Sequence, residues 1–148
     1  MKEKDKQGRL LLEMRYNPLE FFKYVKIQEP GELRKDYEFW PHLLQFMKAL
    51  RDEKRILLLK SKQIGISWTL AADNVRHILT LPGANVVEIS SGDREARSLL
   101  AKSQITYENL PDWMKGILHF VCEPNSGEAF GLKRWGSVIR AFPSTPFA

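Results

Sequence analysis

The first part of the chain carries apolar residues at helical spacing. Residues 1–9 are polar and are expected to be frayed. From about residue 10 to residue 27 the apolar positions follow a helical period, which is interrupted at Asn17-Pro18, where the proline can open a second helix. A further amphipathic pattern at 41–51 predicts another helix before the first strand-like run.

The middle of the chain alternates between strand-like and helix-like patterns. Residues 55–60 contain the uninterrupted apolar run Ile56-Leu57-Leu58-Leu59, which is typical of a strand buried on both faces. Residues 69–80 then predict a helix, 84–90 a second buried strand, and 94–110 another helix. This order predicts an α/β fold whose parallel strands are joined by right-handed crossovers.

After Pro111 the patterns become shorter. Residues 117–123 and 137–142 predict strands, with a glycine-containing turn region between them. The pattern therefore divides the chain into an N-terminal helical segment, 1–54, and an α/β core, 55–148.

Composition and charge narrow the class of protein. The net charge is +5, and residues 1–60 hold most of the excess with 14 basic and 10 acidic groups, a mild bias that allows a polyanionic partner without requiring one. Cys122 is the single cysteine, so an internal disulfide is excluded, and no Cys/His group has zinc-ligand spacing. No apolar run reaches the roughly 18 residues of a membrane span, and the charged start lacks the apolar stretch of a secretion signal, so we expect an intracellular protein.

Candidate chemistry lies in the sequence KSKQIGIS at 60–67, between the predicted first strand and its helix. The common phosphate-binding loop G-x-x-x-x-G-K-[ST] has a lysine directly before the hydroxyl residue, and here that position is Ile66. Gly65 would let the backbone approach an anion closely, and Ser67 would supply the hydroxyl for Mg²⁺. Lys60 or Lys62 can replace the missing cation, because a lysine reaches a phosphate as a flexible point charge. The alternative is a polar turn that Ser67 caps.

The loop resembles the deviant Walker A motif of large terminase subunits, the ATP-driven motors that pump DNA into the heads of tailed phages. The residues that match this motif are Lys60, Ser61, Lys62, Gln63, Gly65 and Ser67. Four further segments are similar to parts of the same family in the same order, namely residues 37–50, 89–102, 109–115 and 137–145. The agreement of several segments is more specific than the loop alone.

The resemblance implies a P-loop NTPase-type core, a three-layer αβα arrangement with parallel strands, incomplete and preceded by N-terminal helices. It implies ATP and Mg²⁺ as ligands, with Ser67 on the metal. The ATP-binding residues implied are Lys60, Ser61, Lys62, Gln63, Gly65, Ile66, Ser67 and Trp68. The family's adenine site lies upstream of the loop, which makes Trp40, Pro41 and Gln45 candidates, although Trp40 and Pro41 can equally start and pack a helix.

The sequence departs from the family at the acidic pair that ATP hydrolysis requires. Four apolar residues followed by Asp-Glu do not occur, and the nearest imitation, 119–123, ends in a single acid before Pro124. No nuclease domain is recognisable either. We therefore assign no catalytic residue and expect a fragment that binds nucleotide weakly without hydrolysing it.

In the full-length context the resemblance implies double-stranded DNA, a portal protein and a small terminase subunit as partners, a homo-oligomeric ring, and the host cytoplasm as location, with no membrane. Two other classes stay open. One is a fragment of a helicase-like P-loop ATPase. The other is a non-enzymatic DNA- or protein-binding module with a vestigial loop, which nucleotide titration separates from the motor.

Overall fold

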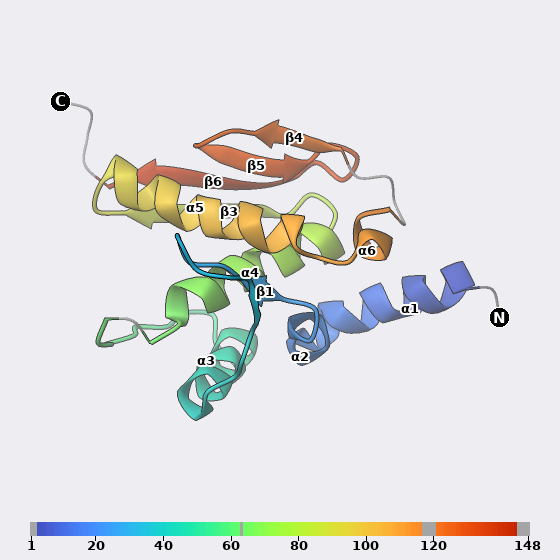
Figure 1. Cartoon of the computed structure of the whole chain (residues 1–148), viewed down its shortest axis with the longest axis horizontal. Coiled ribbons are helices and arrows are strands. Elements are labelled where there is room, and N and C mark those ends of the chain that lie inside the picture. Colours follow the sequence, from blue (N-terminus) through green and yellow to red (C-terminus); the bar gives the residue numbers. More distant parts are fainter. Residues whose placement is uncertain (1–2, 63, 117–120, 145–148) are drawn as a thin grey trace.

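The computed structural model describes residues 3–62, 64–116 and 121–144, and it has a mixed α/β fold (Figure 1). The N-terminal elements are α1 (Glu3–Tyr16), α2 (Pro18–Phe22), β1 (Lys26–Ile27), β2 (Lys35–Asp36) and α3 (Pro41–Asp52). The remaining elements are α4 (Ile66–Thr80), β3 (Asn85–Ser90), α5 (Asp93–Glu108), α6 (Asp112–Gly116), β4 (Cys122–Asn125), β5 (Ala129–Leu132) and β6 (Ser137–Pro143). The α/β class predicted from the sequence is confirmed at this level.

The break predicted at Asn17-Pro18 is confirmed. The Asn17 side chain accepts a hydrogen bond from the backbone N–H of Leu19 at 3.3 Å, and Pro18 occupies the first turn of α2. The prediction of a frayed start is wrong, because α1 already begins at Glu3. Acidic Glu3 and Asp5 in its first turn and basic Arg15 in its last turn complement the helix dipole.

Helix α4 lies at the centre of the molecule. It contacts α1 and α2 on one side and α5 and the sheet on the other (Figure 1). Eleven of its 15 residues are buried. The buried side chains are therefore either apolar or, as in Thr69, Asp73, Arg76 and Thr80, hydrogen-bonded to other groups of the protein. The predicted helix 69–80 is thus confirmed, and it begins three residues earlier, at Ile66.

The main sheet has the strand order β3-β6-β5-β4. Strands β3 and β6 are parallel with Val87 opposite Arg140, while β5 is antiparallel to both β6 and β4. The predicted strands 84–90 and 137–142 are confirmed as β3 and β6. Strand β5 falls in the region that was predicted as a turn. Most of the predicted strand 117–123 lies outside the described residues, and its described end overlaps the first two residues of β4.

The predicted strand at 55–60 is wrong. These residues are extended, belong to no strand and are all exposed, with Leu57 and Leu59 each 91% accessible to solvent. An apolar run is buried only where neighbouring strands or helices cover it, and no described strand pairs with this segment. The strand–helix–strand crossover expected between 55–60 and 84–90 is therefore not formed.

The helices cover one face of the sheet. Helices α4 and α5 pack against the face that carries Glu88 and Ile139. Val87, Ile89 and Phe142 point to the other face and are 51%, 66% and 47% exposed. Within the described residues the expected three-layer αβα arrangement is thus not observed, and the expectation that β3 is buried on both faces is wrong (Figure 1).

The core lies between α4 and its neighbours. Its fully buried side chains come from the N-terminal helices, α4, α5, α6 and the sheet, and the largest are Met14, Phe21, Ile78, Leu79, Leu100, Met114, Leu132 and Ile139. The described part of the chain contains no helix that is long and apolar enough to cross a membrane.

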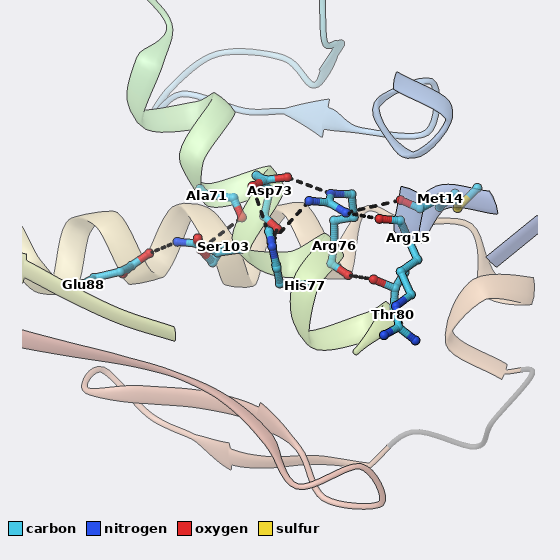
Figure 2. Close-up of polar contacts among 10 residues, drawn as sticks. Met14, Arg15, Ala71, Asp73, Arg76, His77, Thr80, Glu88 and Ser103 are labelled. Carbon is cyan, nitrogen blue, oxygen red and sulfur yellow. Dashed lines mark hydrogen bonds and ion pairs between the residues drawn. The ribbon is translucent and has the colours of Figure 1, made fainter. Parts of the chain in front are cut away.

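Glu88 is a carboxyl group buried in this core. Its side chain is 5% exposed, Asn74 of α4 donates a 2.7 Å hydrogen bond to Oε1, and Oε2 has no hydrogen-bond partner among the described residues (Figure 2). Burial raises the pKa of Glu88 to about 7, and the Asn74 hydrogen bond offsets part of that rise.

We expect the free energy of unfolding to fall as the pH rises from about 4.5 to about 7, because the native state retains a Glu88 proton that the unfolded state releases. Glu88→Gln removes this dependence and stabilises the protein above pH 7 by roughly 1–3 kcal/mol. Urea unfolding at several pH values measures the slope. Exposed Glu13 provides the control, since Glu13→Gln should retain the wild-type slope. An unchanged slope in Glu88→Gln contradicts the assignment.

Candidate functional site

Gly65 gives the loop before α4 its shape. It is the residue before the first turn of the helix and has φ 82°, a left-handed conformation that favours glycine. A Cβ atom at this position would lie 3.2 Å from Leu43 Cδ1 of α3. The glycine predicted from the motif is thus required here by both backbone conformation and close packing.

The amino-terminal end of α4 is open. Gly65 has no side chain to cap the helix, and its carbonyl oxygen accepts hydrogen bonds from the backbone N–H and the hydroxyl of Thr69. The backbone N–H groups of Ile66, Ser67 and Trp68 have no acceptor among the described residues. Such free N–H groups, together with the helix dipole, attract an anion.

Both lysines predicted as phosphate ligands are exposed, and they precede the first residue of α4 by six and four positions in the sequence. The Lys60 amine makes a single weak contact of 3.4 Å with the Ser61 carbonyl oxygen. Neither Lys60 nor Lys62 forms an ion pair with a carboxylate of the described chain. Ser61 and Ser67 are exposed as well, so their hydroxyl groups are accessible to a ligand. Gln63 lies outside the described residues.

Ile66, which stands where the common motif has lysine, is buried. Its side chain is 5% exposed and packs with Leu43 and Phe46 of α3 in a small apolar cluster. The residue therefore anchors the loop to α3. The Ile66 side chain offers no polar group to a phosphate, and its backbone N–H has no acceptor among the described residues.

The Trp68 side chain is buried as well, at 5% exposure. Its indole N–H donates a hydrogen bond to Glu29, and the Lys102 amine lies 4.5 Å from the centre of its ring. The hydrogen bond from Trp68, and then the charge of Lys102, hold the pKa of the Glu29 carboxyl below its usual range. The Trp68 side chain thus joins α4 to α5 and to the loop between β1 and β2.

The start of α3 contacts the loop directly. His42 forms a 2.8 Å hydrogen bond through Nε2 with the Ile64 carbonyl oxygen, and its ring lies 5.6 Å from that of Trp40. Trp40 is 49% exposed, and Pro41 is exposed beside it. Because Trp40 and Pro41 directly precede His42, which is bonded to Ile64, two of the three candidate adenine residues lie near the loop. Gln45 is exposed on α3, and no contact places it at the loop.

Sequence reasoning missed the residues that hold the loop in place. His42 belongs to no recognisable sequence motif. The Tyr37 hydroxyl is hydrogen-bonded to Thr69, which lies 32 residues further along the chain. Burial raises the pKa of Tyr37, so it remains a neutral hydrogen-bonding group at physiological pH. No local pattern signals such long-range contacts.

The described residues show no acidic cluster beside the loop that could hold a metal ion. The described residues contain no group of three His, Cys, Asp or Glu side chains that could hold a metal ion. Glu123, the acid of the Walker B imitation, is exposed on β4 and forms a 2.7 Å ion pair with Lys133. Strand β4 is at the opposite edge of the sheet from β3.

No protein-family model matches this sequence, and no similar curated protein is found.

Proposed function

We propose that this chain binds ATP with Mg²⁺ as the front part of the ATPase domain of a DNA-packaging motor of the large-terminase kind. One observation supports this most directly. The amino-terminal end of α4 has backbone N–H groups without an acceptor among the described residues, and the exposed Ser67 hydroxyl and two lysines without carboxylate partners lie within six residues of it in the sequence. Double-stranded DNA, a portal protein, a small terminase subunit and a ring of subunits belong to the same proposal.

The arrangement has the groups that a triphosphate needs. Three N–H groups and a helix dipole provide fixed partial positive charge, and the lysines add mobile full charges. Ser67 is at the position from which a hydroxyl can coordinate a Mg²⁺ ion that bridges two phosphates. The burial of Ile66 explains why the cation must come from before Gly65 in this loop.

The proposal requires residues 55–60 to be held in place. A phosphate loop is normally fixed between a paired strand and its helix, whereas here only the helix side is fixed, through His42, Leu43 and Thr69. Exposed Leu57 and Leu59 are the side chains through which a further polypeptide segment would cover 55–60. Nucleotide affinity is therefore expected to be weak in this chain alone.

Binding without turnover is the expected activity. The 148 residues contain no apolar strand ending in an acidic pair, so no carboxylate is assigned to polarise an attacking water. Mg²⁺-dependent release of phosphate from ATP by the purified chain should stay at background. Turnover well above background would contradict this proposal.

We expect Lys60→Ala and Lys62→Ala to weaken the binding of Mg²⁺-ATP, with the variant that removes the contacting amine losing about tenfold or more. Isothermal titration calorimetry measures the dissociation constants. Ile66→Val is the control, because it removes a single buried methyl group and leaves both amines and the Ile66 N–H in place.

The results separate the proposal from its alternatives. Binding that is lost in a lysine variant and retained in Ile66→Val supports the displaced cation. If the wild-type chain does not bind Mg²⁺-ATP at all, the loop is vestigial and the non-enzymatic class gains support. A helicase-like ATPase would give the same titration, and packaging of DNA into a procapsid by a full-length relative distinguishes it.

A further inference from the structure

A cavity of about 240 Å³ lies away from the loop, between the end of α1, helix α3 and the carboxyl-terminal half of α4. Residues that line it include Arg15, Pro18, Met47, Arg51, Arg76 and His77. A second cavity of about 240 Å³ shares Pro18, Met47 and Arg51 with it and adds Lys48. The two cavities therefore adjoin along α3, and we call them together the hollow.

Positive charge dominates this hollow. Four cationic side chains line it, Arg15, Lys48, Arg51 and Arg76, against one carboxylate, Asp73. Arg76 is fully engaged by Asp73 and by the carbonyl oxygens of Met14 and Arg15 (Figure 2). A concave surface lined by one sign of charge concentrates ligands of the opposite sign.

The cations at the rim are available to a ligand. Neither Arg15 nor Lys48 forms an ion pair with a carboxylate of the described chain. Arg51 is paired with Asp52, but both side chains are largely solvated, 56% and 41% exposed, so the pair can exchange partners at little cost.

The floor of the hollow is apolar. Pro18 and Met47 are buried, and Leu50 and Leu81 also line the first cavity. An apolar floor beneath charged groups selects a ligand that has an apolar body as well as an anionic end. A volume of about 240 Å³ in each cavity is suited to a compact molecule.

We propose that this hollow binds a compact organic anion, with its charged group between Arg15 and Arg51 and its apolar body on Pro18 and Met47. The site is independent of the proposed nucleotide loop, which is about two and a half turns away along α4. Because the ligand would contact α1, α3 and α4 together, it would also stabilise the packing of the N-terminal helices.

Phenyl phosphate is the probe, titrated into the ¹⁵N-labelled chain and followed by NMR. We expect saturable shifts at amides of residues 15–17, 47–51 and 76–81, with a dissociation constant on the order of 1 mM or lower. Benzoate should bind at the same amides. Neutral phenol and inorganic phosphate should each bind at least about tenfold more weakly, because each lacks one half of the recognised chemistry.

Arg15→Gln and Arg51→Gln should each weaken phenyl phosphate binding about tenfold. Arg34→Gln is the matched control, because Arg34 is an exposed arginine outside the hollow, and it should bind as the wild type does. Equal affinity for phenol, unchanged affinity in both rim variants, or shifts spread over all basic surfaces would each overturn the proposal. The last result would instead indicate non-specific attraction of the anionic probe to basic side chains.

Discussion

Arg76→Met is expected to lower the free energy of unfolding by roughly 3–5 kcal/mol, because it leaves a buried carboxylate without its partner. Arg76 Nε donates a 2.7 Å hydrogen bond to Asp73 Oδ1, and the two side chains are 8% and 9% exposed. Methionine fills a similar volume but carries no charge. Asp73 would then retain the 3.4 Å contact of Oδ2 with His77 Nδ1 in place of a full ion pair.

The same substitution also detaches a helix end. Arg76 Nη1 donates to the carbonyl oxygens of Arg15 at 3.0 Å and Met14 at 3.4 Å, in the last turn of α1 (Figure 2). Those carbonyl groups have no partners within their own helix. Amide hydrogen exchange in α1 should therefore accelerate in Arg76→Met more than exchange in α5.

Two variants test this interpretation by urea unfolding. Arg51 forms an ion pair of the same length with Asp52, 2.7 Å, but on the surface, so Arg51→Met should leave the unfolding midpoint nearly unchanged. The double variant Asp73→Leu/Arg76→Met removes both buried charges and should recover much of the lost stability. If Arg76→Met and Arg51→Met lose equal stability, burial is not what makes the Arg76 pair important.

The helices can be predicted because their signals are local. The apolar stripe at 41–51, the Asn17-Pro18 interruption and the mixed pattern at 69–80 each depend on residues within a few turns of one another. The start of α1 is harder to predict because its polar residues are also typical of a frayed end, whereas the charges of Glu3, Asp5 and Arg15 support the helix through its dipole.

The strands can be predicted less well because pairing is not local. The run 56–59 satisfies every sequence criterion for a buried strand and yet is exposed, since a strand is buried only by partners elsewhere in the polypeptide. Strand β5 is the reverse case, because it forms a strand although its sequence favours a turn. Its sequence Ala129–Leu132 contains Gly131, which a turn also favours, but Gly131 is required there because a Cβ would lie 2.5 Å from the Ser137 carbonyl oxygen of β6.

In the candidate site, too, local features can be predicted from the sequence and long-range contacts cannot. Gly65, Ser67 and the two lysines lie within eight consecutive residues, so the motif alone is enough to group them. The roles of the Ile66 and Trp68 side chains depend on packing partners on α3 and α5, which a motif does not contain.

We expect the chain to self-associate through residues 55–60, and Leu57→Lys/Leu59→Lys to abolish that association. Both side chains are 91% exposed in an extended segment without a strand partner among the described residues. Strand β3 is an edge strand of the described sheet, and its Val87 and Ile89 are exposed on the sheet face that the helices leave uncovered. Such surfaces pair with other strands. Burying two leucines contributes roughly 3–6 kcal/mol, which corresponds to a factor of about 10²–10⁴ in the association constant.

Sedimentation equilibrium over a range of chain concentrations measures the association. Leu33→Lys is a closely matched control, because Leu33 is 90% exposed in the loop between β1 and β2, outside the extended segment. It should leave association unchanged if the extended run is the contact, whereas equal effects of both variants would assign the association to added charge. Because neither leucine packs against the core, the thermal midpoint of the monomer should stay the same. A lower midpoint would show instead that 55–60 is already covered within the monomer in solution.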